Sequence, residues 1–186
     1  MEFQMDHEYR DHYPAPLLMI SGVIDACLAI GGALIVIIVF SNAVFRGFGP
    51  DLSWSLEVSA FLMLWVTFLG AAAASARGVH MRVTEIFAAL IPNRAKRGLT
   101  LVLNLIVAAL MVSLIRFGAH TAIHVWHEKT TVLYWPVGLL YASMPVGIAL
   151  ALMFHLFNTY LDFTGNGPDV QGQISEGEEH GREGLA

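Results

Sequence analysis

Four histidines are the first candidates for chemistry in this chain. His120, His124 and His127 occur in the segment HTAIHVWHEK, and His155 lies in a later apolar segment. Two histidines four positions apart lie on one face of a helix, where they can bind zinc or, with a histidine of another helix, haem. These histidines therefore make a small membrane cytochrome or a metal-binding subunit one candidate class for the protein.

Three charged side chains lie in or beside apolar segments, where a charge is costly and often functional. They are Asp25, Glu57 and Arg116, which could line the pathway of a self-contained, homo-oligomeric transporter. Because Asp25 precedes the apolar stretch that begins at Cys27, we expect it near the lipid headgroups. Glu57 and Arg116 each lie about one turn inside a predicted helix end, and we expect them to pair with each other or with a partner subunit.

Long apolar segments must position these side chains. The chain of 186 residues is 56% hydrophobic and 13% charged, which is too apolar for an ordinary soluble domain. Each apolar segment is near or above the roughly 20 residues that a helix needs to cross a bilayer. None alternates as a barrel strand would, so the sequence predicts an all-α membrane protein with four transmembrane helices. The segments cover about residues 17–45, 54–76, 99–123 and 134–161.

Placed on these helices, the histidines do not match in depth. His124 is predicted at the outer end of the third helix and His155 nearer the inner end of the fourth, whereas a di-haem bundle needs paired histidines at equal depth. We therefore expect no cofactor and no metal, with Trp126 and Trp135 as interfacial anchors. The single cysteine excludes an intrachain disulfide and a cysteine-based metal cluster.

The positive charges predict the orientation. Half of the ten Lys and Arg residues fall between the second and third apolar segments, against one in each of the other two connections. Cytoplasmic loops of membrane proteins are enriched in Lys and Arg. We expect this loop and both termini in the cytoplasm, and the chain in the inner membrane of a bacterium or archaeon. The clustered residues are Arg77, Arg82, Arg94, Lys96 and Arg97.

The remaining segments give the domain organisation. Residues 82–91 have apolar side chains at helical spacing and end at Pro92, which predicts a short amphipathic helix lying in the interface. A simple basic loop is the alternative. Residues 1–14 form a cytoplasmic N-terminal segment, 15–163 the four-helix domain, and 164–186 a tail rich in Gly and acid that we expect to be disordered.

Small residues in the predicted helices indicate packing faces. Gly70 is followed by four alanines in the second segment, and Gly147 lies in the fourth. Such residues let helices approach closely, and we expect these faces to associate with another membrane protein. The sequence has no phosphate loop, no serine elbow and no basic patch with aromatics, so we expect neither an enzyme nor a nucleic-acid-binding protein.

The order of these motifs resembles a known family. WSLEVSAFLMLWVTFLGAAAASARGVHMRV, then LIPNRAKR and YWPVGLLYASMPVGIALALM, are similar to the small membrane subunit of tripartite ATP-independent periplasmic (TRAP) transporters, the DctQ-like family, over about residues 15–162. The family often has an acidic residue where this chain has Thr84, and Glu85 follows one position later. The residues that carry the resemblance are Trp54, Glu57, Trp65, Gly70, Arg77, Gly78, Val79, His80, Pro136, Tyr141, Pro145 and Gly147.

The resemblance implies a small permease subunit rather than a transporter that works alone. A large membrane subunit would bind the substrate and the sodium ions, and a periplasmic binding protein would deliver organic acids. This chain would contact the large subunit and membrane lipid as a scaffold. The family residues named above are then candidates for structural or interface roles.

Overall fold

The computed structural model describes residues 13–49, 52–78 and 93–164, which form helices and no strand. The predicted all-α fold is confirmed. The predicted helix at 82–91 and the two tails lie outside the described residues. In chain order the helices are α1 (Ala15–Phe48), α2 (Ser53–Ala76), α4 (Asn93–His124), α5 (Val137–Tyr141) and α6 (Ser143–Thr164).

Four stretches of the described chain are long and apolar enough to cross a membrane, as predicted. Continuous apolar runs favour helices because a helix satisfies its own backbone groups inside lipid. At 34 residues, α1 is about 51 Å long, well above the roughly 30 Å of the hydrocarbon core. A helix of this length fits the core by tilting. The stretches are Ala15–Phe48, Ser53–Ala76, Leu101–His124 and Val137–Leu161.

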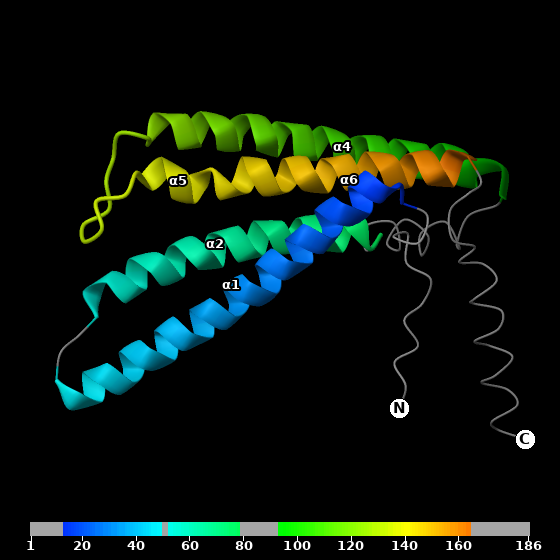
Figure 1. The fold of residues 1–186 in the computed structure, drawn as a ribbon. Coiled ribbons are helices and arrows are strands. Elements are labelled where there is room, and N and C mark those ends of the chain that lie inside the picture. Colours follow the sequence, from blue (N-terminus) through cyan, green and yellow to red (C-terminus); the bar gives the residue numbers. More distant parts are fainter. Residues whose placement is uncertain (1–12, 50–51, 79–92, 165–186) are drawn as a thin grey trace, which may run out of the picture.

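The helices form a bundle in which α6 is central (Figure 1). One side of α6 packs against α2 and the other against α4, while α1 packs against α2 at the edge of the bundle. Figure 1 shows α1 running obliquely past α2. The connection between α4 and α5 reaches across to the beginning of α2. The end of the bundle that carries this connection is called the hairpin end. The opposite end, where α1 begins and α2 and α6 finish, is called the Tyr13 end.

The buried core lies where α6 meets α2, and small residues dominate it on the α2 side. Ala72 and Ala76 are almost completely buried, and Phe154 of α6 is fully buried with them. Most large apolar side chains of α1 and α4 are exposed instead, which suits a protein surrounded by lipid. The cluster consists of Tyr13, Ile24, Ala72, Ala73, Ala76, Met111, Ala151, Phe154 and Leu161.

The start of α4 differs from the prediction. The helix begins at Asn93, directly after Pro92, instead of near residue 99. Arg94, Lys96 and Arg97, which we expected in a loop, therefore belong to its first turns. The apolar run gave the length of the span and not the length of the helix, because a helix can extend beyond the hydrocarbon core with charged residues on it.

The fourth apolar segment is also different from the predicted single helix at 134–161. Helical structure begins only at Val137, after Pro136, and is interrupted at Ala142 between α5 and α6. Pro145 has no N–H group, so the carbonyl of Tyr141 loses its helical donor, which explains a break at this point. Helical bonding resumes on either side, from Ala142 N to Gly138 O and from Val146 N to Ala142 O.

Candidate functional site

Glu57, near the beginning of α2, binds the connection between α4 and α5 through hydrogen bonds. Its carboxylate accepts hydrogen bonds from the backbone N–H groups of Val132 and Leu133, both at 2.8 Å, and from the Thr131 hydroxyl at 3.0 Å. Two successive backbone N–H groups that converge on one anion form a compact binding nest. A side chain of one transmembrane helix therefore fixes a loop more than 70 residues later in the sequence.

The loop that Glu57 holds is itself ordered by backbone bonds. Residues 128–136, which we call the hairpin, contain an isolated antiparallel bridge between Lys129 and Pro136. Thr130 N donates to Trp135 O at 2.9 Å, and Val137 N donates to Glu128 O at 2.8 Å. Tyr134 closes the turn with a positive φ of 55°, a backbone angle that residues other than glycine rarely adopt. The predicted fourth helix, 134–161, included the last three residues of this hairpin.

Aromatic side chains connect the hairpin to α2. Trp135 packs edge-on against Phe61, with ring centroids 5.7 Å apart, and Phe61 in turn lies 5.9 Å from Trp65. The buried indole N–H of Trp65 has no hydrogen-bond partner among the described residues. Trp54, at the start of the same helix, is 42% exposed. Of these two family residues, Trp65 supports the hairpin contact and Trp54 remains on the surface.

The expected pair between Glu57 and Arg116 does not form in the described part of the chain. Both Glu57 oxygens are bonded to the hairpin. Arg116 is exposed on α4, which packs against α5 and α6, whereas α2 lies on the other side of α6. The prediction of a mutual pair was wrong because linear depth placed the two charges at one level without showing that another helix separates them, while a pair with a partner subunit stays a prediction for Arg116.

At the Tyr13 end, a buried polar network joins α1, α2 and α6. Asn158 of α6 donates its amide N–H to the Ser75 carbonyl at 2.8 Å and accepts from the Tyr13 hydroxyl. The same hydroxyl lies 3.0 Å from the carbonyl of Ala76. The last carbonyls of a helix have no partner within it, so these side chains satisfy the end of α2. The Tyr13 ring also stacks on Phe154.

A second buried polar contact joins α6 to α4. His155 is 3% exposed, and its Nε2 atom lies 3.4 Å from the backbone carbonyl of Asn104. The side-chain amide N–H₂ of Asn104 is buried and has no hydrogen-bond partner among the described residues. From its residue type, His155 is a candidate metal or haem ligand. In the structure its ring contacts the backbone of the neighbouring helix α4.

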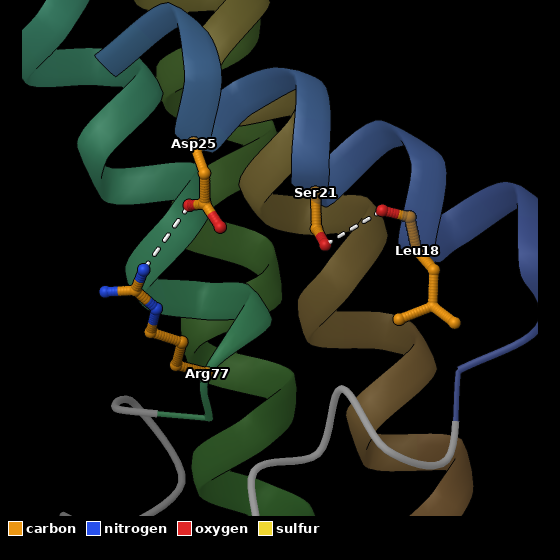
Figure 2. Close-up of polar contacts among 4 residues, drawn as sticks. All are labelled: Leu18, Ser21, Asp25 and Arg77. Atoms are coloured by element: carbon orange, nitrogen blue, oxygen red, sulfur yellow. Dashed lines mark hydrogen bonds and ion pairs between the residues drawn. The ribbon is translucent and has the colours of Figure 1, made fainter. Parts of the chain in front are cut away.

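Asp25 and Arg77 form an ion pair between α1 and the end of α2 (Figure 2). The Arg77 Nη2 atom lies 3.3 Å from Asp25 Oδ1, and both side chains are partly exposed. In Figure 2 Ser21 lies one turn away on the same helix, and its hydroxyl donates to the Leu18 carbonyl at 3.2 Å. Asp25 thus lies level with the end of α2 and is paired there.

Of the two glycines expected on association surfaces, Gly147 packs closely within the chain. A Cβ atom at Gly147 would lie 2.6 Å from both Cβ and the carbonyl oxygen of Phe68 in α2. A Cβ at Gly70 would approach Leu28 of α1 at 3.9 Å, an ordinary contact. Gly147 therefore sets the spacing of α6 and α2, and Pro145 breaks the helix just before it. Two further family residues, Val79 and His80, lie outside the described residues.

The described side chains include no group of three or more His, Cys, Asp and Glu placed to hold a metal ion. His120 and His124 lie on one face of α4, as expected, with parallel rings 6.3 Å apart. Tyr13, Asn104 and Asn158 were not among the residues predicted from the sequence to have a role. An isolated asparagine within a transmembrane segment is costly unless it is bonded, and that cost was the available signal.

Fold and contacts define a multi-pass membrane protein whose buried polar groups hold its own helices together. The family model of the DctQ component of tripartite ATP-independent periplasmic transporters matches residues 14–165. The chain therefore belongs to this family of transport components. It is also similar to the ectoine TRAP transporter small permease protein TeaB of Halomonas elongata, with 26% identity over 170 residues that cover 86% of this chain and 88% of the relative.

Proposed function

We propose that this chain is the scaffold subunit of a three-component transporter, holding the large membrane subunit that performs sodium-coupled uptake of organic acids. The observation that carries the proposal is the family match over nearly all of the described chain. The internal contacts support a structural role, because Asn158, His155 and Glu57 each join separate parts of this chain. Substrate and sodium ions would bind the large subunit, and a periplasmic binding protein would supply the substrate.

The proposed orientation puts the Tyr13 end in the cytoplasm and the hairpin end in the periplasm. Arg77 and the basic residues at the beginning of α4 all belong to the Tyr13 end, while the hairpin end has Arg46, in the last turn of α1, and Lys129. This asymmetry agrees with the positive-inside rule. Cysteine substitutions of Asn93 and Thr130, in a chain with Cys27 replaced, provide the test. Only the second should react with an impermeant thiol reagent in intact cells, and the reverse pattern would refute the orientation.

The large subunit would share the outer surface of the bundle with lipid. Only Ser21, Ile24 and Gly31 of α1 are buried in the chain by itself. Long apolar side chains cover the rest of α1 and much of α4. In this arrangement the stationary part of the transporter becomes wider, while the moving part belongs to the partner.

Reconstitution tests the function directly. Proteoliposomes that contain the large subunit, this chain and the binding protein should accumulate a labelled organic acid when a sodium gradient is applied. Omission of this chain should reduce uptake to background while the other two proteins remain present. Full uptake without this chain, or uptake by this chain alone, would refute the scaffold role.

The substrate class and the absence of a cofactor need separate measurements. The relative TeaB is named for ectoine, and for this chain we propose a carboxylate substrate on the basis of the family. A competition series with carboxylates and their amides should show inhibition by the carboxylates alone.

His124→Ala should leave both uptake and the visible absorption spectrum unchanged. A haem band lost with His124 would support a cytochrome instead.

A further inference from the structure

One face of α4 is exposed along most of the span Leu101–His124 and contains a charge. The buried residues of this helix, among them Met111, Gly118 and Ala122, recur on the other side, where α4 packs against α5 and α6. The exposed residues follow one another at three or four positions, and we call them the Arg116 face. They are Leu105, Ala109, Val112, Arg116, His120 and Ile123.

Arg116 is the residue of this face that lipid satisfies poorly. Within the part of the chain that the structure describes, its guanidinium group makes no hydrogen bond or ion pair. A charged side chain inside a transmembrane span is costly, and such residues commonly pair with another polar group. On α1, by contrast, Asp25 is already paired with Arg77. The exposed surface of α4 therefore requires a polar partner at membrane depth.

The position of Arg116 favours a protein partner over the lipid headgroups. Long basic side chains near a helix end can extend to the headgroups. Arg116, however, lies about 12 Å before the end of α4 at His124. The Cα–Cβ bonds of a helix also tilt toward its N-terminus, which for α4 is the Tyr13 end. The side chain of Arg116 thus leaves the helix in the direction away from the nearer headgroups.

A second copy of this chain does not supply the missing group. The four spans contain two carboxylates, those of Asp25 and Glu57. Asp25 is paired with Arg77 at the Tyr13 end, far from the level of Arg116. Glu57 lies at the hairpin end, but both of its oxygens accept hydrogen bonds from its own hairpin. Since a second copy has the same orientation in the membrane, its carboxylates are equally committed.

We propose that the Arg116 face is the surface on which the large membrane subunit docks, with Arg116 bound to a carboxylate of that subunit inside the membrane. This proposal rests on the proposed function, which supplies the partner. Apolar side chains on both sides of Arg116 exclude water from the pair, and a charge pair that is closed off in this way contributes to specificity. The contact also fixes the depth at which the two subunits meet.

Subunit affinity in dodecyl maltoside gives the first test. Arg116→Gln should raise the Kd between this chain and the large subunit at least about tenfold, because the partner's carboxylate loses its counter-charge. Arg116→Lys keeps the charge and should recover part of the affinity. Thermal unfolding of the purified chain should be the same for all three, since the described structure gives Arg116 no polar partner within the chain. An unchanged Kd for Arg116→Gln would overturn the proposal.

Two bulky substitutions on α4 test the position of the docking surface. Val112→Trp adds volume to the Arg116 face and should raise the Kd at least about tenfold. Leu110→Trp is the matched control, because Leu110 lies about 160° around the helix from Val112. The two side chains are 59% and 53% exposed for Leu110 and Val112, respectively. An equal effect of the two substitutions would contradict docking on this face.

A photo-cross-linking amino acid at Val112 identifies what covers the face. The assembled complex is irradiated in nanodiscs of phosphatidylethanolamine and phosphatidylglycerol, and an adduct with the large subunit should form. The cross-linked peptide should lie beside an Asp or Glu residue of that subunit. Replacing this acid by its amide should raise the Kd for the wild-type chain but not raise it further for Arg116→Gln. Adducts with lipid alone or with a second copy, or additive effects, would overturn the proposal.

A phospholipid phosphate is another source of negative charge for Arg116. Dodecyl maltoside has no phosphate, so the effect of Arg116→Gln should be as large in delipidated complex as in the nanodiscs. An effect confined to the nanodiscs would mean that lipid bridges the subunits, and would overturn the direct pair.

The proposed function and the docking proposal fail in different ways. If this chain does not co-purify with the large subunit, or uptake does not need it, the proposed function fails. If the complex assembles and transports but Arg116→Gln and Val112→Trp bind the large subunit with wild-type Kd, the docking proposal alone fails.

Discussion

Two transmembrane helices of this chain, α6 and α1, use similar apolar compositions in opposite ways. α6 is surrounded by α2, α4 and α5, and its buried side chains include Phe154, His155 and Asn158. α1 is longer but contacts chiefly α2 and leaves most of its surface exposed. The difference teaches that α6 is committed to the fold of the chain itself, while α1 retains surface for lipid and, in the proposed function, for the large subunit.

The glycines of the two helices give the strongest test of this comparison. Gly147→Leu should lower the stability of the subunit by about 3 kcal/mol, because the new side chain meets the backbone of Phe68. Gly32→Leu on α1 is the matched control, since a Cβ there has nothing within 4 Å. Thermal unfolding of the detergent-solubilised chain measures both. Equal destabilisation by the two variants would contradict the assignment of α6 to the interior.

Loss of the buried amide at the Tyr13 end should have the next largest effect. Asn158→Leu keeps the branched shape in a larger side chain and removes two hydrogen bonds, to the Ser75 carbonyl and from the Tyr13 hydroxyl, at an expected cost of about 1–3 kcal/mol. Tyr13→Phe should destabilise in the same direction, whereas Tyr160→Phe, whose ring is 62% exposed, should not. If Tyr13→Phe and Tyr160→Phe unfold at the same temperature, the network does not stabilise the fold.

The ion pair of α1 should matter least. Asp25→Asn and Arg77→Ala should each change the free energy of unfolding by less than about 1 kcal/mol, since exposed ion pairs contribute little. The side chains are 31% and 47% exposed, respectively. A double-mutant cycle at low and high salt should give a small coupling that salt weakens. A coupling as large as the effect of Asn158→Leu would remove the contrast between α1 and α6.

The sequence predicted the spans well and the contacts between them poorly. Runs of apolar residues are a local property, so the four helices followed from them, while the family was recognised from the order of its motifs. The predicted partner of Glu57, Arg116, was wrong because Glu57 binds backbone N–H groups of the hairpin. Every residue has such a group, so no sequence pattern distinguishes them. Gly147 was correctly seen as a close-packing residue, but its partner, Phe68, lies inside the chain. The choice between an internal and an external partner requires the three-dimensional arrangement.

Polar residues show the same limit at a finer scale. Asn158 and His155 lie three positions apart on α6, yet one bonds to α2 and the other to α4. The helical repeat shows that such residues lie near each other on one helix. It does not show which neighbour each one faces, because that depends on how the helices are packed around α6.

The contact between Glu57 and Thr131 spans 74 residues, and this separation orders events during synthesis. At ribosomal rates of 5–20 residues per second, α2 is made roughly 4–15 s before the segment that receives its carboxylate. During that interval the Glu57 carboxylate lacks the backbone N–H donors that it binds in the folded chain. The hydrogen bonds between Glu57 and residues 131–133 can form only after α4 has been made and inserted. Their formation therefore marks the moment when the later helices of the nascent chain pack against the earlier ones.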